Sequence, residues 1–273
     1  MTLKSSLKNS AVLIKKSKKP FFAIFTLQLL FMVLFFAVHL HYQPKMLQNT
    51  KAILDYMENV QIDGQKAAQE MLAGKFSLGP DPLMISRNYR EFRSSFVALS
   101  LISLLLFIAF CGTIWYFTSV ISSNKKFNVK SYLNFILKFS VVSVIFAAFS
   151  FGAVFLALNS FFNPFSQASL PMLIFSIIAT LILAYFTYVS FPLLGRHSLK
   201  ELAKRIFSIG INHLFRIIFC IFIVLSLIAS GLILVFYLIE NGNILAMSAS
   251  IAGVLLLMGF LRIFFCIYVN GLD

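Results

Sequence analysis

The sequence predicts an all-α fold, a polytopic integral membrane helical bundle with about six transmembrane helices, and three observations support this prediction. First, 60% of the 273 residues are hydrophobic and only 12% are charged, whereas a soluble domain carries roughly 25% charged residues. Second, the 33 phenylalanines lie in long apolar runs. Third, six of these runs are long enough to cross a bilayer. A soluble fold cannot hide such an excess, because its surface must be largely wettable.

The apolar runs define the elements in order. A transmembrane helix needs about 20 apolar residues, and six runs have this length: residues 21–40, 96–121, 133–158, 171–194, 214–239 and 244–269. The last five runs are expected to form a five-helix transmembrane bundle over residues 96–273. Residues 1–20 are expected to form a basic amphipathic segment on the cytoplasmic side. One face of its helix would carry Leu3, Leu7, Ala11 and Ile14.

Residues 41–95 are expected to form a small helical cap outside the membrane, between the first and second spans. Pro44 is placed to open a helix, and Gly64 interrupts this helix. A second short helix is expected over residues 65–73, with Gly74 at its C-terminal end. A segment of this length buries little core alone. It is therefore expected to pack on the outer helix ends or on a partner.

Basic residues gather in the short segments on one side of the predicted membrane. These are the N-terminal segment, the stretch after the second span and the stretch after the fourth span. The positive-inside rule makes this side cytoplasmic, which places both termini in the cytoplasm of a plasma-membrane protein. The net charge of +14 is thus explained by the membrane. A nucleic-acid partner is not predicted, because such proteins concentrate Lys and Arg on one face of a soluble domain.

The same basic segments supply predicted contacts with anionic lipids of the inner leaflet or with an acidic partner. On the opposite side, three arginines recur every three residues before the second span, and their guanidinium groups are suited to lipid phosphates. The alternative is an ordinary solvated basic face. The predicted contact residues are Arg87, Arg90, Arg93, Lys125, Lys126, Arg196, Lys200, Lys204 and Arg205.

An interfacial helix is expected after the fourth span. Ser198 and Glu201 have capping-box spacing, and Lys200 and Lys204 lie opposite an apolar face. Gly210 is expected to break this helix, and Asn212 to cap the next. Residues 198–200 are similar in type to residues 128–130 after the second span. This similarity indicates either a tandem duplication of helix pairs or the ordinary chemistry of cytoplasmic loops.

The spans carry few ionisable side chains. Lys138, Arg216 and Arg262 lie a turn or two from cytoplasmic helix ends, where they are expected to snorkel to the headgroups. No HExxH, Walker A or glycine-rich dinucleotide motif occurs. The three cysteines are expected to be small buried hydrophobes without metal-ligand spacing. The sequence therefore predicts no enzyme, and no catalytic, cofactor-binding or metal-binding residue.

Small residues four positions apart mark expected helix–helix contacts, either inside one bundle or between subunits. In lipid, such pairs let backbones approach closely, where van der Waals fit drives association. The predicted packing residues are Ala148 and Gly152, Ser226 and Ser230, and Ser248 and Ala252.

Two functional hypotheses follow from this layout. One span, an outer cap and five further spans make a layout similar to the six-helix permease subunits of some ABC exporters, although no motif is shared. The resemblance implies a permease-like subunit of an envelope transport complex, with a cytoplasmic ATPase or another membrane subunit as partner. The alternative is a membrane-organising or lipid-interacting scaffold without transport activity. The absence of polar residues at mid-depth slightly favours the second hypothesis, because a polar cargo path needs a polar lining.

Overall fold

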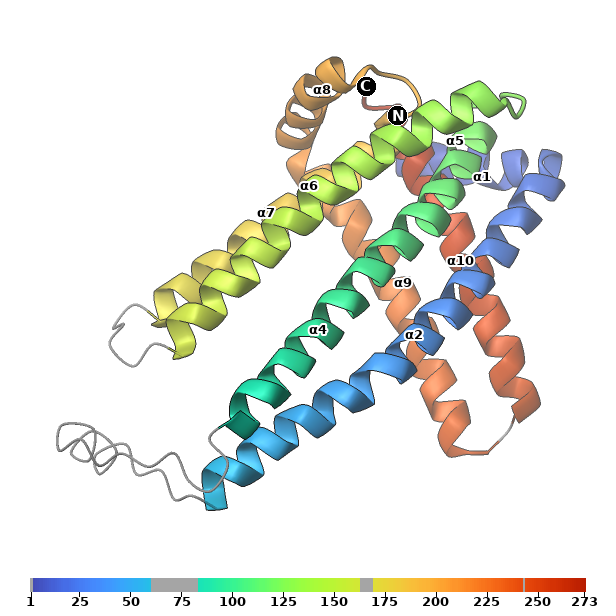
Figure 1. Ribbon diagram of the computed structural model, residues 1–273. Coiled ribbons are helices and arrows are strands. Elements are labelled where there is room, and N and C mark those ends of the chain that lie inside the picture. Colours follow the sequence, from blue (N-terminus) through green and yellow to red (C-terminus); the bar gives the residue numbers. More distant parts are fainter. Residues whose placement is uncertain (1, 60–82, 163–168, 243) are drawn as a thin grey trace. The chain divides into compact units, whose positions relative to one another are not determined.

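The computed structural model describes residues 2–59, 83–162, 169–242 and 244–273 (Figure 1). In these ranges all regular secondary structure is helical. The elements in order are α1 (Leu3–Lys16), α2 (Lys18–Asn59), α4 (Leu83–Leu106), the π-helix η1 (Phe107–Cys111), α5 (Gly112–Ser123), α6 (Val129–Phe162), α7 (Ser169–Leu193), α8 (Leu199–Asn212), α9 (Leu214–Glu240) and α10 (Ile244–Asn270).

Six helical stretches of the described chain are long and apolar enough to cross a membrane, which confirms the predicted fold class. These spans are Lys18–Tyr56, Leu83–Ser123, Val129–Ala153, Ile174–Leu193, Leu214–Glu240 and Ile244–Asn270. Each contains the centre of one predicted run, and the first two are about twice as long as a bilayer requires.

The chain divides into two compact units. The larger unit consists of residues 1–31 and 107–273, and the smaller unit of residues 32–106. Helix α2 therefore begins in the larger unit and ends in the smaller one.

The smaller unit corrects one expectation about the cap. Pro44 does not open a helix but lies inside α2, which continues to Asn59. Proline removes one backbone hydrogen bond, and side chains bridge the turn that contains it. The Lys45 ammonium lies 3.1 Å from His41 Nε2 and 5.9 Å from the centre of the Tyr42 ring. The second predicted cap helix, residues 65–73, falls outside the described residues.

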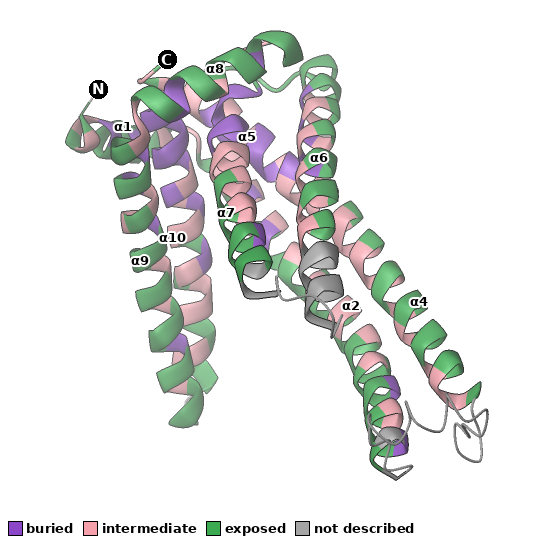
Figure 2. Ribbon diagram, turned by 90° about the vertical axis from the view of Figure 1, so that its left-hand side faces the viewer, coloured by how far each residue is buried: buried purple, intermediate pink, exposed green. Residues whose placement is uncertain are grey.

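The core of the larger unit lies where α5, α6, α7 and α10 meet (Figure 2). Phe139 of α6 is fully buried, with its ring centre 5.6 Å from that of Phe107 and 4.8 Å from that of Phe191. On α10, buried residues concentrate in the last ten positions before Asn270. Towards the opposite ends, many large apolar side chains on α6, α7 and α9 are exposed. Lipid is the solvent that suits such surfaces.

Glycine 112 lets α5 approach α6 closely. A Cβ atom at this position would lie 3.0 Å from Ile136 Cδ1 and 3.1 Å from Phe139 Cδ1. Phe139 cannot shift, because it is fully buried among other rings. A larger side chain at position 112 must therefore push the two helices apart.

We expect a Gly112→Leu substitution to destabilise the chain by about 1 kcal/mol. Overpacking destabilises a core by roughly 1–3 kcal/mol. The better helix propensity of leucine offsets about 1 kcal/mol of this loss. Gly253→Leu is the matched control, because Gly253 is exposed and has open space around its Cβ position. The measurement is the thermal unfolding midpoint in detergent. Equal midpoints for the two variants would contradict the close contact.

A helix, α8, forms after the fourth span as expected, with two corrections at its end. Gly210 does not break the helix, which continues to Asn212, and the residue between α8 and α9 is His213 without a side-chain cap. The Tyr185 hydroxyl donates to the Gly210 carbonyl at 2.8 Å. A Cβ at position 210 would lie 2.8 Å from the Phe186 ring. Glycine is thus required at position 210 because α8 packs closely against α7 there. The carbonyl that accepts from Tyr185 lies within α8, which continues past Gly210.

Candidate functional site

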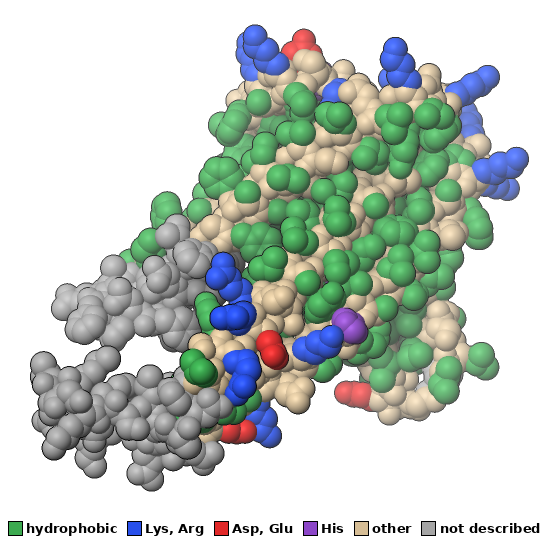
Figure 3. All heavy atoms as spheres, viewed as in Figure 1, with side chains coloured by type: hydrophobic (Ala, Val, Ile, Leu, Met, Phe, Trp, Pro, Cys, Tyr) green, Lys and Arg blue, Asp and Glu red, His purple; other side chains and the backbone are tan. Residues whose placement is uncertain are grey.

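Basic side chains gather at one end of the larger unit, where α1, α8 and the α5–α6 loop lie together (Figures 1 and 3). We call this region the basic end. Six of the predicted contact residues lie at the basic end, and all six are exposed: Lys125, Lys126, Arg196, Lys200, Lys204 and Arg205. These residues come from two separate segments of the sequence, and their contact with lipids or a partner stays a prediction. The lysines of α1, which include Lys15 and Lys16, are also exposed here.

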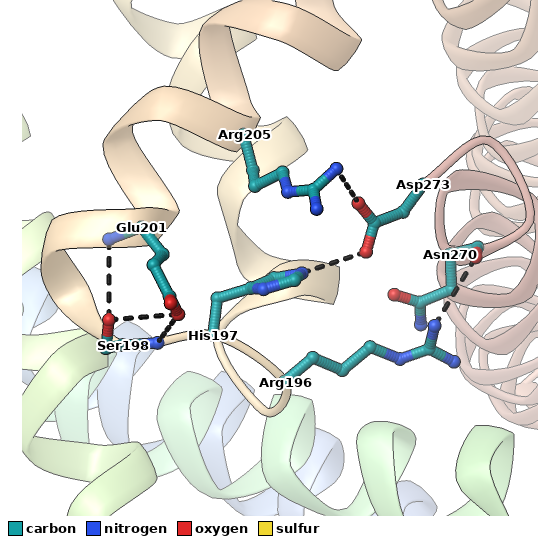
Figure 4. Close-up of polar contacts among 7 residues, drawn as sticks. All are labelled: Arg196, His197, Ser198, Glu201, Arg205, Asn270 and Asp273. Carbon is teal, nitrogen blue, oxygen red and sulfur yellow. Dashed lines mark hydrogen bonds and ion pairs between the residues drawn. The ribbon is translucent and has the colours of Figure 1, made fainter.

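Part of this charge is held by contacts within the protein (Figure 4). Asp273 lies 2.8 Å from His197 Nε2 and 3.3 Å from Arg205 Nη1. Arg196 Nη1 donates to the Asn270 carbonyl at 3.4 Å. These contacts tie the α7–α8 turn and α8 to the end of α10. Arg196 and Arg205 therefore have structural partners.

The capping box of α8 is present as the sequence predicts. The Ser198 hydroxyl accepts from the Glu201 backbone N–H at 3.4 Å, and Glu201 Oε2 accepts from the Ser198 N–H at 3.3 Å. The Ser198 backbone and hydroxyl donors lower the pKa of the Glu201 carboxyl, and the charges of His197 and Arg205 act in the same direction.

We expect the start of α8 to lose order in acid. The pKa of Glu201 is lower in the folded state, so the capping box stabilises α8 at neutral pH and is lost as pH falls through that lowered pKa. The measurement is the NMR chemical shift of the α8 backbone amides during an acid titration. Glu201→Gln should remove the transition and Glu240→Gln should keep it. A transition that survives in the Glu201 variant would contradict this assignment.

Cations also line a cavity of about 130 Å³ that lies within the basic end, between α5, α6 and the α7–α8 turn. Its charged residues are Lys125, Lys126 and Lys138. Lys138 reaches back to the basic end, as its position predicts, but its ammonium donates to the His197 carbonyl at 2.8 Å. Its ammonium thus has a partner within the protein, and its contact with lipid headgroups stays a prediction. Sequence reasoning did not group Lys138 with the other two, because it lies more than ten residues away in the chain.

Arg262 is the one span arginine that contradicts its expected role, since it does not snorkel. Its guanidinium carbon lies 5.6 Å from the centre of the Trp115 ring. In the amide orientation that satisfies both neighbours, Gln28 accepts from Arg262 Nη1 at 3.1 Å and donates to the Leu255 carbonyl at 3.0 Å. Gln28 and Trp115 are both buried. We call Gln28, Trp115 and Arg262 the polar triad.

The depth of the polar triad follows from helix geometry. Arg262 lies eight residues before the end of α10, and Trp115 eight residues before the end of α5. A rise of 1.5 Å per residue places both about 12 Å below the basic end. α10 has 27 residues and is therefore about 40 Å long, so the triad lies between the middle of α10 and its basic end. In the described part of the chain, Arg262 makes no ion pair with a carboxylate.

The remaining predicted residues are not members of these groups. Arg87, Arg90 and Arg93 are exposed on α4 in the smaller unit. Of the packing residues, Ala148, Gly152, Ser226, Ser230 and Ser248 are exposed, and Ala252 is half-buried. The close approach of α9 to α10 occurs instead at Gly231, where a Cβ would lie 2.8 Å from Val254 Cγ2. Contacts of the predicted packing residues with another subunit stay a prediction.

The three cysteines are free thiols, as expected. Cys220 and Cys266 are buried and Cys111 is half-buried. Cys266 contacts the Ser122 hydroxyl at 3.3 Å and accepts from Asn270 Nδ2 at 3.4 Å. These contacts agree with a packing role inside the bundle.

No protein-family model, curated protein or solved structure matches this chain. The class of protein is therefore defined by the fold: a multi-pass α-helical membrane protein with six candidate spans in its described residues. Among the described residues of the larger unit, three sets of polar groups are candidates for a site, namely the contacts around Asp273, the lysine-lined cavity and the polar triad. The chemistry that these sets support is the binding of anions by ammonium, guanidinium and hydroxyl groups.

Proposed function

We propose that this chain is a non-enzymatic multi-pass protein of the cell membrane that binds anionic inner-leaflet lipids through its basic end and so organises the surrounding membrane. The observation that carries this proposal is the gathering of α1, α8 and the α5–α6 loop, all with exposed lysines, at one end of the larger unit. By the positive-inside rule that end is cytoplasmic, where anionic lipids attract such segments.

The side chains of α8 support this proposal. Leu202 and Ile209 are buried in the core, whereas Phe207 and Ile211 are 55% and 62% exposed. The apolar face of α8 is thus wider than its contact with the bundle. Exposed apolar residues beside lysines are typical of helices that lie in the lipid interface. α1 has the same character, with Leu13 and Ile14 packed inward and Leu7 51% exposed.

The test is the lipid that accompanies the purified chain. We expect mass spectrometry of the tagged chain in mild detergent to find anionic lipids enriched over their share of the membrane, and salt to reduce the enrichment. A helix with exposed neutral apolar residues only, fused to the same tag, is the control for detergent carry-over. Accompanying lipids in the same proportions as the membrane would contradict the proposal.

The permease-like subunit is the second candidate, and the polar triad is the observation that favours it. An arginine held inside a span, without a carboxylate partner in the described chain, is the kind of residue that lines a path for an anionic cargo. This function requires an ATPase, because no nucleotide-binding motif occurs in the sequence. The test is mass spectrometry of the proteins that accompany the tagged chain. A stoichiometric nucleotide-binding subunit supports this candidate, and its absence from the complex contradicts it.

A further inference from the structure

The lysine-lined cavity at the basic end has the composition of an anion site. Around its three lysines lie short polar side chains from α5 and α6, namely Ser119, Ser123, Ser131 and Asn134. No acid is among the residues that line it. In the described chain, the nearest basic-end acids are already engaged, since Glu201 bonds to Ser198 and Asp273 pairs with His197 and Arg205. The positive charge of the cavity is therefore not neutralised by the protein.

The walls of the cavity are held in place by packing and hydrogen bonds. The Tyr116 hydroxyl donates to the Asn128 carbonyl at 3.0 Å, which fixes the α5–α6 loop. Asn124 ends α5 with a left-handed φ of 51°, a conformation that asparagine tolerates well. Lys138 is held by its bond to the His197 carbonyl. An ammonium has three donors, so Lys138 retains two for a ligand.

The size and polarity of the cavity select the ligand. Its volume of about 130 Å³ exceeds many times the roughly 10–15 Å³ that one water needs, but it is small for a whole lipid. Ammonium and hydroxyl donors suit the several oxygens of a phosphate group. The N-terminal turns of α6, which carry Ser131 and Asn134, add the favourable end of a helix dipole.

The apolar lining distinguishes a lipid phosphate from a free one. Tyr116, Phe135 and Leu194 also line the cavity and are buried in the core. The cavity lies where the second span ends at Ser123 and the third begins at Val129, which is the depth of the headgroups. We infer that this cavity binds the phosphate group of an anionic lipid, whose acyl chains stay in the bilayer. This inference rests on the proposed function and assigns it a specific site.

The experiment compares two double variants of the full chain in detergent. Lys125→Gln with Lys126→Gln removes two charges from the cavity, and Lys200→Gln with Lys204→Gln removes two from the exposed face of α8. Lys138 is left in place, because its bond to His197 belongs to the fold. Native mass spectrometry measures the affinity for the first molecule of a short-chain phosphatidic acid. We expect the cavity variant to bind it roughly tenfold more weakly and the α8 variant to change less than about threefold.

The other outcomes overturn either the site or the function. Equal weakening in both variants would overturn the cavity while the proposed function stands. A wild-type chain that binds phosphatidic acid no better than a zwitterionic lipid would overturn both. Displacement of the lipid by an equal concentration of inorganic phosphate would assign the cavity to free phosphate. On the wild-type chain, a fatty acid of the same length should bind more weakly than phosphatidic acid, and equal binding would overturn the phosphate assignment. Unchanged unfolding midpoints without lipid show that the variants fold.

Discussion

A Gln28→Leu substitution is expected to destabilise the chain by about 2–3 kcal/mol, the cost of a lost hydrogen bond to a charged group. Gln28 is buried, and its carbonyl accepts from Arg262 Nη1 at 3.1 Å. Leucine fills the space but offers no acceptor, so among the described residues the guanidinium keeps the face of Trp115 as its partner. A cation–π contact stabilises by about 1–2 kcal/mol. This is less than the free energy needed to remove a charged group from water. The measurement is the unfolding free energy in detergent or bicelles.

The double variant Gln28→Leu with Arg262→Leu separates the lost hydrogen bond from simple repacking. Replacing a buried polar pair by apolar groups is often neutral, whereas removing one partner is costly. We therefore expect the double variant to regain at least half of the stability that Gln28→Leu loses. Gln48→Leu is the matched control, because Gln48 is exposed on the same helix, α2. Additive losses in the double variant would show that Gln28 and Arg262 do not interact.

The double variant also bears on function. If two leucines serve the fold as well as the pair does, then stability alone does not explain an arginine inside a span. A membrane span accepts leucine far more readily than arginine. Polar residues kept inside spans at a cost are those that a function requires. A stable double variant would thus favour the permease-like candidate. An unstable double variant would indicate that the polar triad serves to hold α2, α5 and α10 together.

The spans were predictable because their signal is local. A run of about 20 apolar residues determines a transmembrane helix almost by itself, since only a helix satisfies the backbone in lipid. The Ser198–Glu201 capping box was predictable for the same reason, as its partners are three residues apart. Pro44 was misread because proline occurs both at the start of a helix and inside a long one, and its position in the sequence does not tell which applies.

The polar groups of the site were less predictable, because their partners are distant in the chain. Arg262 has a sequence position that fits snorkelling, and only the packing of α2 and α5 against α10 shows that Gln28 and Trp115 hold it inside. Lys138 contacts the His197 carbonyl, 59 residues away. The small-residue pairs have the same limit, because the spacing of Ser226 and Ser230 does not tell whether they meet α10 or another subunit.

A Phe139→Ala substitution is expected to be among the most damaging of the apolar changes, at about 2 kcal/mol. Phe139 is fully buried, stacks on Phe191 and fills the space beside Gly112. In a soluble protein such a truncation costs about 3–5 kcal/mol, from a transfer part and a cavity part. Lipid is as apolar as the core, so the transfer part largely disappears for a membrane bundle. A cavity on the order of 100 Å³ at about 24 cal/mol per Å³ leaves about 2 kcal/mol.

The matched control for this prediction is Phe149→Ala on the same helix. Phe149 lies ten residues after Phe139 on α6 and is 66% exposed, so its truncation leaves no cavity and should change the unfolding free energy by less than about 0.5 kcal/mol. The measurement is unfolding in bicelles, where lipid solvates the exposed ring. A loss of 3–5 kcal/mol for Phe139→Ala would mean that water reaches this part of the unfolded chain. Equal losses for the two variants would contradict the packing of α6 against α5 and α7, because only one of the two rings faces them.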